Sequence, residues 1–275
     1  HSLDSLDEPH QIPRKLRRKV FWRTWGHDAG YEFVVSKNIF SMIKKDFRFL
    51  RQRREINQFA GIGIANCIDE LDMKRRYGKR AKLYKFSYLS QTSINQSYVG
   101  NNVANEKKNI LIGHSGYPGD MHIQTMKKLI PVKDKIEIFL PLTYGNKEYI
   151  KTVVSYANEN FKNSAHFIFE SLDFDSYCKL LSTMNFAFFP YRNSYALGNI
   201  NIAIAYSVNL VLNSNGIIAN AFSKEKIPFI DFNNFNPNTD LIFKEYDISQ
   251  TQMRKRSYSE KLNDLKIVFD LLKNV

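Results

Sequence analysis

Cysteine and long apolar runs are scarce in this sequence. Its 275 residues include only two cysteines, Cys67 and Cys178. Two are too few for a disulfide framework or for a zinc site made of cysteines, so we expect two partly buried thiols in a reducing compartment. No run of about 18 uncharged apolar residues occurs, which predicts the absence of a transmembrane helix. No period of about 20–50 residues recurs, which argues against a solenoid.

Negative charge is also in short supply. Forty Lys and Arg residues face 27 Asp and Glu residues, giving a formal net charge of +13. Such an excess favours an anionic partner: nucleic acid, an anionic membrane surface or a phosphorylated small molecule. The cations concentrate in three runs, at residues 14–19, 44–54 and 74–80.

The basic runs allow two interpretations. They are either solvated helix faces that need no partner or a surface that docks on anionic lipid. The run at 44–54 is interleaved with Phe47, Phe49 and Leu50, a composition typical of a helix that lies on a membrane surface. We therefore expect the basic N-terminal helices to contact an anionic membrane.

Alternating strand and helix patterns predict an α/β protein with two domains. Residues 90–108 are rich in Ser, Asn and Gln, so we predict a linker there, with an N-terminal domain at 1–108 and a C-terminal domain at 109–275. The predicted strands are residues 20–25, 59–67, 81–89, 110–112, 136–140, 166–169, 186–191, 209–212 and 227–230. The predicted helices are residues 37–54, 68–77, 121–130, 146–161, 174–184, 199–206, 216–223 and 259–272.

The stretch from residue 109 to 149 organises the C-terminal domain. An apolar strand at 110–112 runs into a small-residue turn, then a helix, a second strand at 136–140 and a second turn at 141–145. This is a βαβ unit, the building block of a parallel sheet. Ligands of such sheets bind at the carboxyl ends of the strands, where both turns lie.

Several residues near these turns are candidates for holding a nucleotide diphosphate. Backbone amides of a Gly/Ser loop at a helix N-terminus can hold phosphate oxygens, and glycine keeps side chains out of the way. An arginine beyond a strand can add charge. The candidates are Gly113, His114, Ser115, Gly116, Tyr144, Asn146, Arg192 and Asn199.

Each candidate also has a purely structural alternative. A Gly/Ser turn after a strand is often only a turn. His114 can form local hydrogen bonds, and Asn199 can cap a helix. Asp173 precedes the predicted helix at 174–184, where its carboxylate fits an N-cap. The aromatic residues of the stretch 186–191 fit the core of the sheet.

Ordered blocks over residues 20–240 resemble a known family. The blocks are ILIGHSGYPGDMHI, IEIFLPLTYGNKEYI, ESLDFDSYCKLLSTMNFAFFPYRNSYALGNINIAIAYSVNLVLN and, more faintly, VFWRTWGHDAGYEF. They are similar to the bacterial TDP-N-acetylfucosamine:lipid II N-acetylfucosaminyltransferases, the 4-α-L-fucosyltransferase-like enzymes of enterobacterial common antigen synthesis.

The resemblance implies an inverting glycosyltransferase with two Rossmann-like domains, the GT-B architecture. The C-terminal domain of such enzymes holds the nucleotide sugar. The N-terminal domain offers the lipid-linked acceptor and usually the general base. No metal is expected, and a TDP-sugar is the expected donor. The family's first N-terminal strands have no counterpart here, so we expect an incomplete N-terminal domain. The expected location is the cytoplasmic face of the cell membrane.

The resemblance also places the candidate base. Asp28 lies in the block WGHD, which is similar to the family's WGxD, and follows a predicted strand. A carboxylate in a closed site can have its pKa raised toward neutrality, which suits removal of a proton from a sugar hydroxyl. His27 is the second candidate and Glu32 the third. The structural alternative for Asp28 is a turn carboxylate that bonds its own backbone.

Two other classes stay open on the sequence alone. A nucleic-acid-binding protein would use the same positive charge, although no zinc spacing, RNP-like strand or basic heptad region occurs. A transferase remnant that has lost catalysis would bind donor or partner only.

Overall fold

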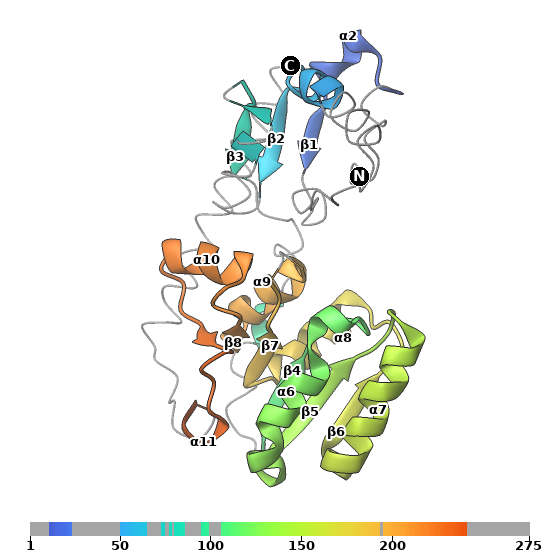
Figure 1. The fold of residues 1–275 in the computed structure, drawn as a ribbon, viewed down its shortest axis with the longest axis vertical. Coiled ribbons are helices and arrows are strands. Elements are labelled where there is room, and N and C mark those ends of the chain that lie inside the picture. Colours follow the sequence, from blue (N-terminus) through green and yellow to red (C-terminus); the bar gives the residue numbers. More distant parts are fainter. Residues whose placement is uncertain are drawn as a thin grey trace, which may run out of the picture. The chain divides into compact units, whose positions relative to one another are not determined.

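The computed structural model of the chain describes residues 11–23, 50–64, 73–74, 77–78, 80–85, 95–98, 106–192 and 195–240. Contacts between residues divide the chain into two units. The first comprises His1–Tyr88 with Tyr258–Val275, and the second comprises Leu89–Ser257 (Figure 1). The boundary that the sequence predicts between residues 108 and 109 falls within the second unit of this division.

A six-stranded sheet forms the second unit, in the order β6-β5-β4-β7-β8-β9. Every neighbouring pair of strands is parallel. The strands are β4 (Lys108–Ile112), β5 (Ile136–Pro141), β6 (Ala165–Ile168), β7 (Phe186–Phe189), β8 (Asn209–Leu212) and β9 (Ile230–Asp231). The first strand in sequence, β4, lies inside the sheet, with later strands added on both sides. This is the strand order of a doubly wound Rossmann sheet.

Helices connect these strands. The α-helices are α6 (His122–Leu129), α7 (Lys147–Phe161), α8 (Phe174–Ser182), α9 (Leu197–Ala205), α10 (Ile217–Lys224) and α11 (Pro237–Asp240). The 3₁₀ helices are η2 (Gln96–Tyr98), η3 (Pro118–Asp120), η4 (Ile130–Lys135) and η5 (Lys162–Ser164). None of the described helices is both long and apolar enough to cross a membrane.

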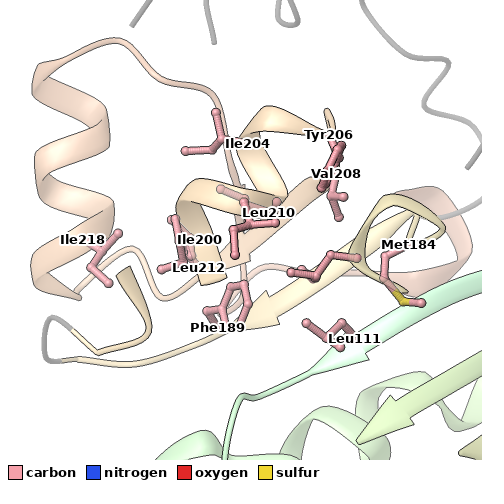
Figure 2. Packing of buried hydrophobic residues seen from close by; sticks show 14 of the residues in the cluster. Leu111, Met184, Phe189, Ile200, Ile204, Tyr206, Val208, Leu210, Leu212 and Ile218 are labelled. Carbon is pink, nitrogen blue, oxygen red and sulfur yellow. The ribbon is translucent and has the colours of Figure 1, made fainter. Parts of the chain in front are cut away.

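The apolar run of β4 is buried on both faces. Ile110 and Ile112 join one core cluster, with residues of α6 and α7. Leu111, between them, joins the other cluster, with residues of α8, α9 and α10. Figure 2 shows Leu111 in that second cluster together with Ile200 of α9 and Ile218 of α10. Successive side chains of a strand point to opposite faces, so a continuous apolar strand needs cover on both sides.

The predicted order of elements in this unit is confirmed, with shifted ends. The helix predicted from residue 199 begins at Leu197, and the strand predicted at 186–191 ends at Phe189. The bounds of the strand predicted at 227–230 are wrong, because β9 covers only Ile230–Asp231. Ile227 instead packs into the core with α10, and Pro228 has no N–H group to donate to a ladder.

The first unit contains a three-stranded parallel sheet, β1-β2-β3. Its elements are the helix α2 (Arg14–Arg17), the strands β1 (Phe21–Arg23), β2 (Gly61–Ile64) and β3 (Leu83–Lys85), and a helical segment at 50–56. Its core is the cluster of Trp22, Ile56, Phe59, Ile62, Ile64, Met73 and Tyr77. Residues 24–49 and 241–275 lie outside the described residues, and with them lie the helix predicted at 259–272 and parts of the strand predicted at 20–25 and of the helix predicted at 37–54.

Candidate functional site

Two loops meet where the strand order of the second unit reverses. The strands β4 and β7 are neighbours in the sheet, and each leads into a loop at its carboxyl end. In open parallel sheets, ligands bind outside the strand ends at this switch point. A contact of 2.7 Å between Nδ1 of His114 and the hydroxyl of Tyr191 joins the two loops. The candidate site is built around this contact.

Asp120 is the buried anchor of the loop after β4. Its side chain is 2% exposed, and its Oδ2 accepts hydrogen bonds from the amide and the hydroxyl of Ser115 at 2.8 and 2.7 Å. Its Oδ1 lies 3.0 Å from Nδ1 of His114. Burial raises the pKa of Asp120, but the bonds with His114 and Ser115 outweigh burial, so the pKa of Asp120 lies below its usual value. The carboxylate is therefore ionised at neutral pH.

This carboxylate fixes the orientation of His114. An ionised Asp120 can only accept, so Nδ1 of His114 carries the proton that the two share. Burial raises the pKa of Tyr191 well above its usual value, so Tyr191 is a neutral phenol. The other ring nitrogen, Nε2, contacts no polar atom of a described residue, and the His114 side chain is 18% exposed. His114 thus presents Nε2 to solvent in a fixed direction.

Three exposed tyrosines surround His114 and Tyr191. Tyr117 and Tyr144 are 52% and 54% exposed, and Tyr195 is 37% exposed. The ring of Tyr144 lies 6.3 Å from the rings of both His114 and Tyr117, and the ring of Tyr195 lies 6.1 Å from that of Tyr191. Exposed aromatic faces at one site suit stacking on the rings of a ligand.

The backbone amides of the loop after β4 are already occupied. The amide of Gly113 donates to the carbonyl of Phe188 at 3.0 Å, and that of Gly116 donates to the carbonyl of Tyr144 at 2.6 Å. The amides of His114 and Ser115 both point to Oδ2 of Asp120, at 3.5 and 2.8 Å. The predicted cradle of free amides at Gly113, Ser115 and Gly116 is therefore not formed, because protein oxygens take the place of phosphate.

The glycines of this loop have structural reasons instead. Gly113 has φ +71°, and a Cβ there would lie 2.7 Å from Nε2 of His122. A Cβ on Gly116 would lie 2.3 Å from the side chain of Ile150. Gly145, at φ +140°, packs against the backbone of Gly116. These close approaches hold the loops after β4 and β5 together.

The N-terminus of α6 is covered by Tyr149. The phenol oxygen of Tyr149 accepts hydrogen bonds from the amides of His122 and Ile123, while burial raises the pKa of this phenol. Nδ1 of His122 lies 3.4 Å from the same hydroxyl. The ring of His122 is fully buried, its Nε2 has no partner in the described part of the chain, and burial lowers its pKa to about 4.

The N-terminus of α9 is open. Its N-cap, Ala196, lies in the left-handed region at φ 56° and supplies no side-chain cap. No described residue accepts from the amides of Leu197, Gly198 or Asn199. A Cβ on Gly198 would meet nothing within 4 Å. Asn199 sits inside the helix and does not cap it, which leaves its predicted ligand role as the open alternative.

Arg192 precedes this open helix. Its side chain is exposed, and no described residue pairs with its guanidinium. Its carbonyl accepts from the amide of Ile217, the first residue of α10, at 2.9 Å. Arg192 directly follows Tyr191 in the chain, so its backbone adjoins the residue that contacts His114. A helix N-terminus with a neighbouring arginine is a chemically suitable anion site.

The remaining candidates divide between ligand and structural roles. Asn146 caps α7, since its Oδ1 accepts from the amide of Tyr149 at 2.9 Å. Asp173 caps α8, as predicted, by accepting from the amide of Ser176 at 2.9 Å.

Sequence reasoning missed Asp120 and assigned Tyr191 to the sheet core. A carboxylate only five residues after Ser115, in the same loop, was the available signal for Asp120.

The candidate bases Asp28, His27 and Glu32 lie outside the described residues, and their roles stay predictions. Within the described ranges, no group of three or more His, Cys, Asp or Glu side chains is placed to hold a metal ion. Cys178 is buried in the core of the second unit.

Solved glycosyltransferases share this fold at low sequence identity. A trehalose-6-phosphate synthase studied with bisubstrate glycomimetics matches with a TM-score of 0.63 and 12% identity, over 100% of this chain and 73% of that one. The α,α-trehalose-phosphate synthase (UDP-forming) from Burkholderia vietnamiensis matches with 0.56 and 11%, over 86% and 66%. WaaG, a glycosyltransferase of lipopolysaccharide biosynthesis, matches with 0.51 and 8%, over 82% and 66%.

These similarities show the predicted GT-B fold class, with its Rossmann-like α/β architecture. This chain spans less than two thirds of the length of three matched structures, covering 62% of a trehalose-6-phosphate phosphatase N-terminal domain from Candida albicans, 66% of WaaG and 48% of TarM. A family model described as 4-alpha-L-fucosyltransferase, glycosyl transferase group 56, matches residues 12–256. The chain belongs to this 4-α-L-fucosyltransferase family.

Proposed function

We propose that the chain is an inverting glycosyltransferase of cell-surface polysaccharide synthesis. It transfers a deoxy- or amino-sugar resembling 4-acetamido-4,6-dideoxygalactose from a TDP-sugar to a polyprenyl-diphosphate-linked saccharide. The observation that supports this best is the switch-point site in a member of a fucosyltransferase family. There the open N-terminus of α9 follows Tyr195, whose ring lies 6.1 Å from that of Tyr191 in the ordered Asp120–His114–Tyr191 cluster, and Arg192 is the residue after Tyr191.

The donor's diphosphate binds at the open end of α9. Transfer breaks the bond between the anomeric carbon and the diphosphate, so negative charge grows on the departing oxygen. The free amides of Leu197, Gly198 and Asn199 and the guanidinium of Arg192 are the groups that stabilise this charge. A bidentate contact from Arg192 would also orient the diphosphate. The protein supplies these charges without a metal.

His114 contacts the same diphosphate through Nε2. Asp120 keeps a proton on Nδ1, so a second proton on the ring resides on Nε2 and can be donated to a phosphate oxygen. Asp120 and Tyr191 position the ring and do not touch the donor. Tyr144, exposed beside His114, offers an aromatic face to the sugar or to the nucleobase of the donor.

The acceptor hydroxyl loses its proton to a base in the first unit. Its oxygen attacks the anomeric carbon on the face opposite the diphosphate, the new glycosidic bond forms as the old one breaks, and the proton passes to Asp28. His27 and Glu32 are the second and third choices for this base. The pathway is that of enterobacterial common antigen, and the lipid-linked acceptor places the enzyme at the inner face of the cell membrane.

A transfer assay tests this proposal. The full chain is incubated with a polyprenyl-diphosphate saccharide and with TDP-, UDP- or GDP-linked sugars, and the product is separated and weighed by mass spectrometry. We expect transfer from the TDP-sugar with inversion at the anomeric carbon. Asp28→Asn lowers kcat by about a hundredfold or more, while Asp134→Asn, at an exposed position of η4, leaves kcat unchanged.

Two outcomes count against the proposal. Transfer from a UDP- or GDP-sugar alone would show that the donor nucleotide is UDP or GDP and not TDP. Absence of transfer from every donor, with TDP still bound, would favour a transferase remnant that has lost catalysis.

A further inference from the structure

The exposed large apolar side chains of the second unit gather at one edge of its sheet. Among the described residues of this unit they are Tyr117, Tyr144, Phe169, Leu172, Phe174 and Tyr195. Each of the connections that follow β4, β5, β6 and β7 carries at least one of them. All six therefore lie beyond the carboxyl ends of the strands, which is the edge where ligands of parallel sheets bind.

Tyr117 and Tyr144 stand on backbone that is fixed before any ligand arrives. Gly116, beside Tyr117, forms a β-bridge with Gly145, beside Tyr144. The amide of Gly116 donates to the carbonyl of Tyr144 at 2.6 Å, and the amide of Asn146 donates to the carbonyl of Gly116 at 3.0 Å. A Cβ on Gly145 would lie 2.4 Å from the backbone of Gly116. Two exposed rings on such a backbone are preorganised, which lowers the entropy cost of binding a ligand.

The two rings form a corner beside His114. Their centroids lie 6.3 Å apart with an angle of 66° between the ring planes, so a planar group that stacks on one ring meets the other with its edge. The ring of Tyr144 also lies 6.3 Å from that of His114. Among the described side chains, Tyr117 has no ring contact with His114. The order outward from His114 is therefore Tyr144 and then Tyr117.

This order matches the order of the parts of a nucleotide sugar. In the proposed function, His114 contacts the diphosphate. The transferred sugar is bonded directly to the diphosphate, whereas a ribose separates the nucleobase from it. An aromatic ring one step further out than the neighbour of His114 suits the part that a spacer holds away from the phosphates, and that part is the nucleobase. Stacking also favours the nucleobase, because every base has a planar π-face.

We propose that Tyr117 and Tyr144 form the nucleobase site of this glycosyltransferase. The nucleobase of the donor stacks on Tyr117 and meets Tyr144 along its edge. The proposal rests on the proposed function for the position of the diphosphate. It adds which part of the donor the two exposed tyrosines hold.

Phe169 offers a matched control at the same edge of the sheet. It is 52% exposed, as Tyr117 is. Its ring lies 5.8 Å from that of Phe167 and nearly parallel to it, and within the described part of the chain it has no ring contact with Tyr144 or Tyr117. Phe169→Leu therefore removes an equally exposed aromatic ring from outside the corner.

Titration calorimetry of the full chain with TDP and with inorganic pyrophosphate tests the proposal. Tyr117→Leu removes the ring but keeps an apolar side chain. We expect it to weaken TDP binding about fivefold or more and to leave pyrophosphate binding unchanged, and Tyr144→Leu to act in the same direction. Tyr117→Phe keeps the ring and so keeps wild-type TDP affinity, as does Phe169→Leu.

Four results would overturn the nucleobase site. Unchanged TDP affinity in both leucine variants would show that neither ring contacts the ligand. Equal losses of TDP and pyrophosphate in Tyr117→Leu would make the ring a support of the phosphate site. A loss confined to a TDP-sugar, with TDP unaffected, would assign the corner to the sugar. An equal loss of TDP in Phe169→Leu would reduce the effect to a general loss of apolar surface.

The same titrations distinguish failure of this site from failure of the proposed function. If the wild type binds UDP or GDP in place of TDP, the comparison with pyrophosphate is made with that nucleotide. Binding of no nucleoside diphosphate would refute both the nucleobase site and the donor site. TDP binding that depends on Tyr117, in a chain that transfers no sugar, would refute the transfer and leave the nucleobase site standing.

Discussion

The loop after β4 and the segment after β7 lie at the same edge of one sheet, and they use their backbone amides in opposite ways. The amides of residues 113–116 all donate to oxygen atoms of the protein. The amides of residues 197–199 donate to no described residue. The first segment carries more glycine and looks more like a phosphate loop, but the second is chemically the better anion site.

A glycine in such a loop can therefore meet a need of the backbone without marking a ligand site. Gly113 and Gly116 are required because His122 and Ile150 fill the space where a side chain would stand. Gly198 faces open space, as a glycine beside a ligand does.

The largest effect is expected for Gly116→Val. The new side chain meets Ile150 where only a hydrogen fits, so the variant loses about 3 kcal/mol or more of unfolding free energy. Urea denaturation measures the loss. Gly119→Ala, in the same loop and with no atom within 4 Å of its Cβ, changes stability by less than about 0.5 kcal/mol. Wild-type stability of Gly116→Val would show that the two loops are not held together as described.

The buried imidazole of His122 makes stability depend on pH. Burial lowers its pKa from 6.5 to about 4. Between these two pH values, His122 of the unfolded chain binds a proton that His122 of the folded chain does not bind. Unfolding free energy therefore falls as the pH drops through this range, by on the order of 3 kcal/mol. Urea titrations at a series of pH values measure the slope, which His122→Gln removes. An equal slope in the variant would assign the effect to another group.

Asp120→Asn removes the charge that organises the loop after β4. The side-chain amide of asparagine has one acceptor oxygen and cannot accept all three hydrogen bonds, two from Ser115 and one from His114. We therefore expect a loss of about 2 kcal/mol of unfolding free energy. The measurement is again urea denaturation, at neutral pH. Asp173→Asn is the matched control, because its cap of α8 is exposed and asparagine caps nearly as well. Equal losses in the two variants would deny Asp120 its anchoring role.

The smallest effect is a gain. Gly198→Ala adds a methyl group where no atom lies within 4 Å, and alanine loses less backbone entropy in a helix. We expect α9 to gain about 0.5–1 kcal/mol, seen as a higher Tm. A lower Tm would mean that the space beside Gly198 is filled by the protein itself.

Much of the second unit could be predicted from the sequence. The strands of this sheet are short apolar runs buried on both faces, as in β4 and β7, and the helices between them carry regular apolar spacing. Such signals are local and strong. The ends were less predictable, because Ala196 starts α9 from a left-handed conformation that no residue preference signals.

The site itself was only partly predictable, because its key contacts are long-range. His114 and Tyr191 are 77 residues apart in sequence and meet only because β4 and β7 are neighbours. Asp120 gives no sign of burial in a loop that also contains Tyr117 and Pro118. The sequence indicates which residues could hold phosphate. The folded arrangement decides which of their backbone amides have no protein acceptor.

Titration calorimetry of TDP binding to Arg192→Gln tests whether the donor's diphosphate binds at the start of α9. Arg192 is exposed and its side chain pairs with no described residue, so the variant keeps wild-type stability. We predict that it binds TDP about tenfold more weakly or worse, while Lys224→Gln, at the exposed end of α10, binds as the wild type does. Unchanged TDP affinity in Arg192→Gln would contradict a donor site at the start of α9.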